Sequence, residues 1–179
     1  MTDRFLRVLI LLMSVVFTGC QDNGSEKLNL QQAVAIESGD ECHLCGMIIT
    51  HFPGPKGQLY ERGDMSVRKF CSTRDMFAYL LDPEHSHHVE NVFVHNMAVT
   101  PWDHPQAEAY IDARKAWYVV NSRRKGAMGP TLASFADQKT AQEFIKEYGG
   151  SLYRFDQIDL ALLSEIGFSK PGELHQPDG

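Results

Sequence analysis

The hydrophobic and polar positions in the first part of the chain predict a unit of two strands, a helix and a third strand. Short alternating runs of apolar and polar residues, bounded by turn residues, are typical of half-buried strands. We expect strands of this kind at residues 58–62, 67–70 and 91–95. Apolar residues recur at helical spacing over residues 72–81, and Thr73 is the expected N-cap of that helix.

The second part of the chain repeats this order. We expect strands at residues 116–121, 131–135 and 151–155. A helix is predicted over residues 136–148, with Asp137 as its N-cap and Gly149 and Gly150 at its end. An aromatic strand end, a polar cap and an amphipathic helix occur in both halves. The pattern therefore predicts an α+β fold built from tandem ββαβ units.

The N-terminus has the pattern of an export signal. Two arginines precede a short apolar run at residues 9–17, which is too short for a membrane span of about 20 residues. Residues 17–20 read Phe-Thr-Gly-Cys and resemble the lipobox of bacterial lipoproteins, with Phe17 where that motif usually has leucine. We expect residues 1–19 to be a signal peptide and Cys20 to be acylated. An ordinary secretory signal with an incidental cysteine is the alternative.

The remaining sequence indicates one compact body. The expected parts are a flexible tether at residues 20–32, a metal-binding domain at 33–168 with lobes of about 33–100 and 101–168, and a disordered tail at 169–179. The formal net charge of the whole chain is −6. An acidic protein is a poor partner for nucleic acid, so we expect none.

The cysteine count does not fit a disulfide scaffold. If Cys20 carries lipid, Cys42, Cys45 and Cys71 remain, which is an odd number of thiols in an oxidising compartment. At least one thiol is then free or metal-bound. A Cys42–Cys45 disulfide in the resting protein is an open alternative, and it is compatible with metal binding after reduction.

Residues 42–47 concentrate soft ligands. The segment reads Cys-His-Leu-Cys-Gly-Met and offers the thiols of Cys42 and Cys45, the imidazole of His43 and the thioether of Met47. Sulfur ligands at this density favour Cu(I). Gly46 permits the sharp turn that would bring Met47 towards the two thiols. We therefore expect a Cu(I) site here, with His43 as a further candidate ligand.

Two residues elsewhere are candidate ligands. Met128 stands between glycines and next to a proline, so it belongs to a loop, whereas Met76 lies in a helical pattern and is expected in the core. We expect Met128 to reach the site from the second half. Cys71 follows a strand end and is either a buried small apolar residue or a further ligand. A leftover thiolate, a histidine and a carboxylate would suit Zn(II) as a second metal.

Together these motifs resemble the NosL family. The resemblance rests on the lipobox, residues 42–47, the Gly-Ala-Met-Gly segment at 126–129 and the stretch 134–150, and it covers nearly the whole mature chain. NosL proteins are copper-binding accessory lipoproteins of nitrous oxide reductase maturation. The resemblance implies a tandem ββαβ fold related to part of the organomercurial lyases.

The resemblance also implies a function. We expect a carrier and not an enzyme, which delivers Cu(I) in the periplasm to nitrous oxide reductase or its maturation machinery. It would be held at a membrane by its lipid. Gln21 after the lipidated cysteine is not the acidic residue linked to inner-membrane retention, which favours the outer membrane.

Two enzymatic alternatives remain open. An enzyme that cleaves carbon–mercury bonds would need two thiolates and a proton-donating acid, and Asp75 near Cys71 is a candidate for that acid. A thiol–disulfide oxidoreductase would use Cys42 and Cys45. Its Cys-x-x-Cys motif normally opens a helix, whereas here Gly46 and β-branched residues follow, which disfavours a helix.

Overall fold

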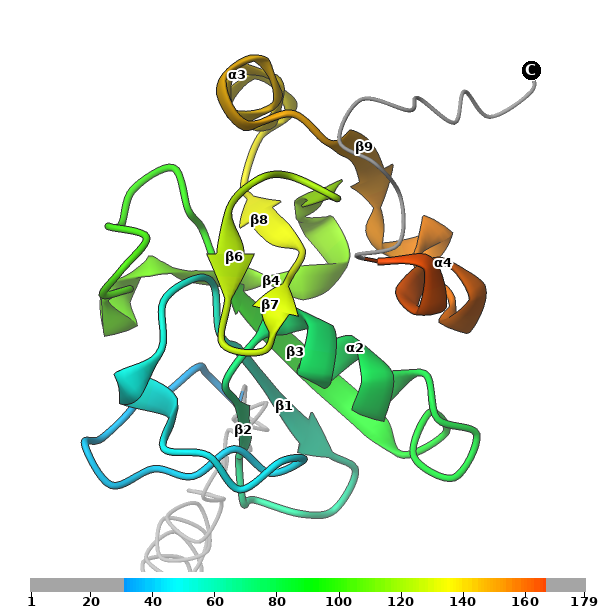
Figure 1. The fold of residues 1–179 in the computed structure, drawn as a ribbon. Helices are drawn as coiled ribbons and strands as arrows, with labels where there is room; N and C mark the ends of the chain where they lie inside the picture. Colours follow the sequence, from blue (N-terminus) through cyan, green and yellow to red (C-terminus); the bar gives the residue numbers. More distant parts are fainter. Residues whose placement is uncertain (1–30, 167–179) are drawn as a thin grey trace, which may run out of the picture. The chain divides into compact units, whose positions relative to one another are not determined.

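Two antiparallel sheets form the framework of residues 31–166, the part of the chain that this computed structural model describes (Figure 1). The predicted signal peptide, the lipidation residue Cys20 and the predicted tail lie outside the described residues, as does most of the tether. Within residues 31–166, no helix is both long enough and apolar enough to cross a membrane.

The first sheet has the strand order β2-β1-β3-β4. Its strands are β1 Gly57–Glu61, β2 Arg68–Phe70, β3 Val89–His95 and β4 Tyr110–Asp112. Helix α2, Thr73–Leu80, connects β2 to β3 and packs against β1 and β2. Strand β4 was not predicted, because three residues between two short 3-10 helices give too little periodicity to identify a strand.

The second sheet repeats the arrangement of the first three strands. Its order is β8-β5-β9, with β5 Trp117–Val120, β8 Ala133–Phe135 and β9 Ser151–Arg154. Helix α3, Gln138–Tyr148, connects β8 to β9. In both sheets the first strand in the chain pairs antiparallel with the second and with the strand after the helix. The predicted α+β fold of tandem ββαβ units is confirmed.

Smaller elements complete the described chain. A hairpin of β6, Lys125–Gly126, and β7, Gly129–Pro130, interrupts the connection from β5 to β8. Helix α4, Leu160–Glu165, follows β9 and packs against α2. The short 3-10 helices are η2 Ile49–His51, η3 Ala107–Ala109, η4 Ala113–Lys115 and η5 Phe155–Gln157.

The side chains of β5 divide between two apolar clusters because successive residues of a strand point to opposite faces. Tyr118 contributes to the larger cluster, which includes Met76 and Phe77 of α2. Val119 contributes to the smaller cluster, in which Trp102 is also buried. The prediction that Met76 is a core residue is confirmed. Helix α2 is therefore packed on several sides, which fixes the position of its N-terminus.

Short polar side chains cap the N-termini of the two long helices. Ser72, not Thr73, is the N-cap of α2: its backbone is extended, and its hydroxyl oxygen accepts a hydrogen bond of 3.0 Å from the backbone N–H of Asp75. The prediction of Thr73 was wrong because its hydroxyl bonds outside the helix, donating to the carbonyl of Leu132 at 2.6 Å. Asp137 caps α3, as predicted, with its carboxylate 2.9 Å from the N–H of Thr140.

Gly57 is expected to tolerate no side chain. A Cβ at this position of β1 would lie 2.5 Å from Sδ and 2.7 Å from Cβ of Met76, which is fully buried. Gly57→Ala should destabilise the fold by about 1–3 kcal/mol through overpacking, measured by urea unfolding. Gly39→Ala is the matched control, since nothing lies within 4 Å of a Cβ there. Equal stability of the two variants would contradict this account of the packing.

Candidate metal centre

Four side chains from two separate segments converge on one point. The thiols of Cys42, Cys45 and Cys71 and the carboxylate of Asp75 have their ligand atoms within 4.8 Å of one another. The Sγ atoms of Cys45 and Cys71 are 3.6 Å apart. Cys42, Cys71 and Asp75 are buried, whereas Cys45 is exposed. The group therefore has one side that is open to solvent.

A tight turn presents the first two cysteines. An isolated bridge pairs Glu41 with Ile48, and within it the N–H of Cys42 donates to the carbonyl of Met47 at 2.8 Å. The N–H of Gly46 donates back to the carbonyl of Cys42 at 2.8 Å. Gly46 has a φ of 73°, a conformation that favours glycine. The sharp turn that we predicted at Gly46 is confirmed, and it keeps the two thiols on one side.

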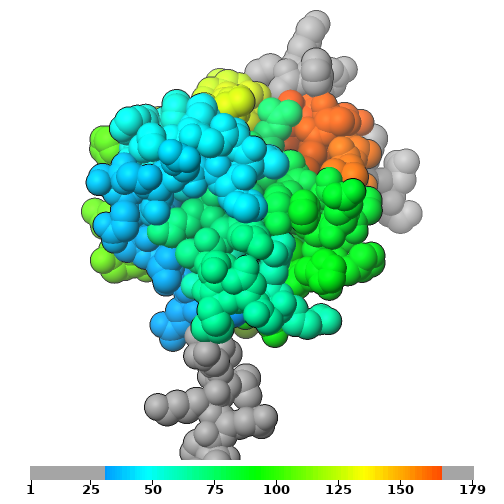
Figure 2. Space-filling view, turned by 90° about the horizontal axis from the view of Figure 1, so that it is seen from below, coloured from blue at the N-terminus to red at the C-terminus, as the bar shows by residue number. Residues whose placement is uncertain are grey.

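The end of β2 holds this turn against helix α2. The N–H of His43 donates to the carbonyl of Lys69 at 2.8 Å, and the ammonium group of Lys69 forms an ion pair with Asp40. Because Cys71 lies two residues after Lys69, these contacts bring the turn beside it. Figure 2 shows the blue and cyan segment, which contains the turn, at the surface next to the teal segment of β1 and β2.

The start of α2 supplies the other two groups. Cys71 precedes the N-cap Ser72, and Asp75 lies in the first turn of the helix. Since the hydroxyl of Ser72 bonds to the backbone of Asp75, the carboxylate is left free to face the thiols. Its Oδ2 accepts a hydrogen bond from the thiol of Cys71 at 3.2 Å and lies 3.7 Å from Sγ of Cys42.

The thiols differ in their readiness to lose a proton. A hydrogen bond from the Cys71 thiol lowers the pKa of Cys42 to about 5, helped by backbone N–H groups and opposed by burial. The same hydrogen bond raises the pKa of Cys71, as do burial and the charge of Asp75. Burial raises the pKa of Cys45. The lowered pKa of Cys42 thus favours its thiolate form, whereas the raised pKa of Cys71 favours its protonated form.

Two of the predicted ligands in the turn lie outside this group of four. The His43 ring packs edge-on against Tyr79, with ring centroids 5.2 Å apart, and against Phe70. Met47 is half-buried and packs against the larger apolar cluster. The carbonyl of Met47 shapes the turn through its bond to Cys42.

Met128 lies at the turn of the β6–β7 hairpin and is 54% exposed. The residue after the hairpin is held to α2, because the hydroxyl of Thr131 lies 3.0 Å from that of Thr73. Thr73 stands between Cys71 and Asp75 in the sequence. The predicted loop position of Met128 is confirmed, and its role as a ligand stays a prediction.

Asp75 was missed as a member of the metal group. The sequence carried a usable signal: a cysteine and an aspartate four residues apart, with a helix N-cap directly after the cysteine. Residues at that spacing meet on one side of a helix start. The Zn(II) prediction gains no support, since residues 31–166 contain no second group of metal-binding side chains separate from this one.

The state of the cysteines is relevant to two alternatives left open above, a Cys42–Cys45 disulfide and a thiol–disulfide oxidoreductase activity. Cys42, Cys45 and Cys71 are all free thiols in this structure. The Cys42–Cys45 pair lies in a turn and not at the start of a helix, so it lacks the helix N-terminus that activates the thiol of a thiol–disulfide oxidoreductase.

Comparisons with known proteins agree with this geometry. A sequence model of the NosL family matches residues 33–163. The chain is 43% identical over 177 residues to the copper-binding lipoprotein NosL of Stutzerimonas stutzeri, covering 96% of this chain and 90% of the relative. It is 30% identical over 166 residues to the copper-binding lipoprotein NosL of Achromobacter cycloclastes, covering 91% and 84%.

A solved structure shows the same fold. The crystal structure of the copper chaperone NosL from Shewanella denitrificans superposes with a TM-score of 0.72 at 56% sequence identity. The match covers 73% of this chain and 98% of that protein.

Oxidation is expected to join Cys45 to Cys71. Their sulfur atoms are 3.6 Å apart, Cys45 is exposed to an oxidant, and the Cys42 thiolate and Asp75 lie beside Cys71 to accept its proton. Treatment of the reduced, metal-free protein with oxidised glutathione should yield a Cys45–Cys71 disulfide in a peptide mass map. Cys71→Ser should instead leave Cys45 glutathionylated or joined to Cys42. A dominant Cys42–Cys45 disulfide in the unmodified chain would contradict the prediction.

Proposed function

The chain belongs to the NosL family, and from that premise we propose that it is a periplasmic Cu(I) metallochaperone that delivers copper for assembly of the copper centres of nitrous oxide reductase. The observation that carries the proposal is the group of three thiols and one carboxylate with a single exposed member. The similar proteins, a copper chaperone and two copper-binding lipoproteins, support it. The maturation partner is inferred from the family resemblance.

The composition of the group favours Cu(I) over harder ions. Thiolates are soft ligands, and Cu(I) accepts low coordination numbers. The depressed pKa of Cys42 provides one thiolate at neutral pH without proton release. We propose Cys42, Cys45 and Cys71 as the sulfur ligands, with Asp75 receiving protons or completing the coordination.

The exposed and the buried thiols would have different roles in copper transfer. Cys45 is the exposed thiol of the group, so an incoming or departing copper ion meets it first. Ligand exchange through Cys45 would transfer Cu(I) between proteins while Cys42 and Cys71 retain it. A carrier of this kind needs no general base and no closed active site, and we propose no enzymatic activity.

Met128 and Met47 are proposed as exchangeable thioether ligands. A thioether is neutral and soft, so it adds affinity for Cu(I) without adding charge. The hairpin of Met128 is fixed beside α2 by the contact between Thr73 and Thr131, while its turn is exposed. We propose that movement of that turn brings the sulfur of Met128 to the exposed side of the group. His43, on the exposed turn, stays a candidate for the same side.

We also propose that Cys20 carries the lipid anchor and holds the protein at a membrane, with Gln21 favouring the outer membrane. The tether would let the domain reach a partner in the periplasm.

Copper titration tests the function. The reduced wild-type chain should bind Cu(I) in competition with a chromophoric Cu(I) chelator, and Cys42→Ala, Cys45→Ala and Cys71→Ala should each weaken binding by about tenfold or more, since each removes a thiolate ligand. Met128→Ala should speed the loss of copper to the chelator while leaving the fold intact. Met65→Ala is its matched control, because Met65 is an exposed thioether on the β1–β2 connection.

The outcomes separate the parts of the proposal. Native affinity in all three cysteine variants would exclude this group as the copper site. An unchanged off-rate and an unchanged sulfur count by X-ray absorption in Met128→Ala would exclude Met128 alone.

The anchor is tested by cell fractionation. Cys20→Ala should remove the site of acylation and move the protein from the membrane fraction to the soluble periplasmic fraction, because no lipid would then hold it. Cys45→Ala is the control, as it also removes a thiol but leaves the lipobox intact. Equal membrane association of Cys20→Ala and wild type would count against a lipid anchor.

A further inference from the structure

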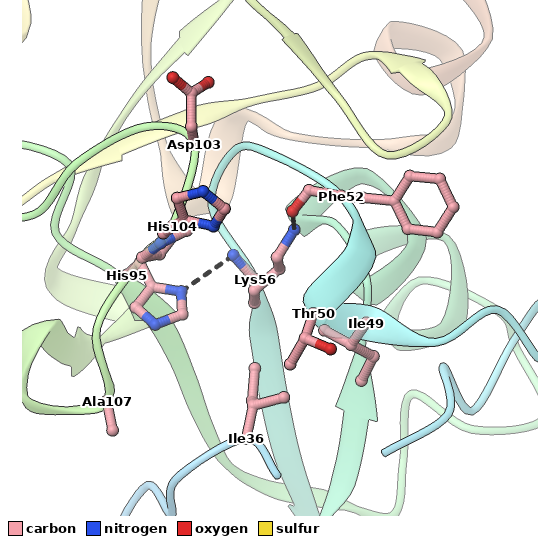
Figure 3. A pocket seen from close by; sticks show the side chains of 10 residues that line it. Ile36, Ile49, Thr50, Phe52, Lys56, His95, Asp103, His104 and Ala107 are labelled. Atoms are coloured by element: carbon pink, nitrogen blue, oxygen red, sulfur yellow. Dashed lines mark hydrogen bonds between the residues drawn. The ribbon is translucent and has the colours of Figure 1, made fainter. Parts of the chain in front are cut away.

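A buried lysine lies behind the metal group. Lys56 is only 2% exposed and forms part of the wall of a cavity of about 140 Å³, together with His95 and Phe52 (Figure 3). Lysine is almost never fully buried unless its charge is compensated. Its position immediately before β1 therefore needs an explanation in terms of charge.

The ammonium group of Lys56 uses all of its donors on main-chain carbonyls. It donates to the carbonyls of Phe52 at 2.7 Å, Pro53 at 3.0 Å and Cys71 at 3.1 Å. Figure 3 shows it pointing towards Phe52, while the backbone N–H of Lys56 donates to Nδ1 of His95 at 3.0 Å. The side chain is thus held in one place, with its charge at the main chain of Cys71.

The carbonyls satisfy the hydrogen bonds of Lys56 but do not neutralise its charge. None of the ion pairs found within residues 31–166 includes Lys56. Burial lowers its pKa to about 8, and the charges of Cys71 and Cys42 act in the opposite direction. The hydrogen bond to the Cys71 carbonyl places the ammonium charge next to the metal group.

We propose that Lys56 is a positioning residue of the copper site, which holds the main chain of Cys71 and sets a fixed positive charge behind the thiolates. This inference rests on the proposed function and deepens it. Lys56 donates a hydrogen bond to the carbonyl of Cys71, so it helps to orient that residue.

The charge matters most when copper is bound. One Cu(I) ion held by two thiolates forms a unit of net charge −1, and the carboxylate of Asp75 adds further negative charge. A cation in the low-dielectric interior offsets this charge far more strongly than one in water. Lys56 thereby permits a buried anionic copper–thiolate unit without a further metal ion.

Copper affinity of Lys56→Met tests the inference. Methionine keeps an unbranched chain but removes the charge and the donors, so Cu(I) affinity should fall by about tenfold or more. Lys56→Arg should restore part of the loss because it keeps the charge. Lys115→Met is the control for net charge, since Lys115 is an exposed lysine paired with Asp112 on the surface. Thermal unfolding of each metal-free variant monitors the fold.

A double-mutant cycle that combines Lys56→Met with Asp75→Asn separates an electrostatic role of Lys56 from a purely structural one. If the charge of Lys56 acts on the anionic metal group, Lys56→Met should lower the Cu(I) affinity less in the Asp75→Asn background than in the wild type. An equal loss in both backgrounds would show that Lys56 contributes to folding and not to the charge balance, and would overturn the proposal.

A measurement on the wild type covers the case in which Lys56→Met does not fold. The ammonium resonance of a buried lysine is observable by nitrogen-edited NMR, and that of Lys56 should shift on Cu(I) loading while that of Lys115 stays unchanged. No shift at Lys56 would overturn the proposal. If the wild type binds no Cu(I), the proposed function fails as well; if it binds and Lys56→Met binds equally, this inference alone fails.

Discussion

The capped N-terminus of helix α2 is the constraint on which the metal group depends. Ser72 ends the extended segment after β2 and starts the helix by accepting the N–H of Asp75. This single bond places Cys71 before the helix and the carboxylate of Asp75 within its first turn. Thr73 then ties the second half of the domain to the same point through Thr131 and Leu132. A helix start that is buried on several sides gives the thiols a fixed partner.

The other half of the metal group is carried by a turn and not by a helix. The 41–48 turn is closed by main-chain hydrogen bonds around Cys42 and is attached to β2 through Lys69. Cys42 is 3% exposed, whereas Cys45, three residues later, faces solvent. A buried thiolate needs hydrogen-bond donors, and the thiol of Cys71 and nearby N–H groups provide them. These hydrogen bonds stabilise the Cys42 thiolate against the cost of its burial, while exposure of Cys45 leaves a route for exchange.

The sequence predicted the parts whose signals are local. Both ββαβ units, the turn at Gly46, the cap at Asp137 and the core position of Met76 each depend on a few neighbouring residues, and each is confirmed. The cap of α2 was misplaced by one residue because Ser72 and Thr73 are both good caps, and the choice is made by the distant carbonyl of Leu132. Contacts between remote segments carry no such local signal.

Asp75 and Lys56 show the same limit at the site. An aspartate near a helix start has a sufficient local explanation as a residue of the first turn. A lysine before a strand reads as a surface residue, and only the fold reveals that Lys56 is buried against Cys71. Sequence reasoning identified the soft ligands because their chemistry is unusual. It named Asp75 only as the acid of an enzymatic alternative and did not single out Lys56, because common residues acquire their roles only through burial.

A copper carrier must both retain and release Cu(I), and the thiols and carboxylate of the metal group suit both requirements. Thiolates bind Cu(I) strongly, but several thiolates crowded in an apolar interior repel one another and resist ionisation. The domain makes the thiols unequally acidic: the pKa of Cys42 is lowered, that of Cys71 is raised, and Oδ2 of Asp75 lies 3.2 Å from Sγ of Cys71. With Cys71 as a ligand, as we propose, copper binding would displace its proton, and return of the proton would oppose retention of copper. In the proposed carrier, the buried thiols would hold Cu(I) and the exposed thiol would release it.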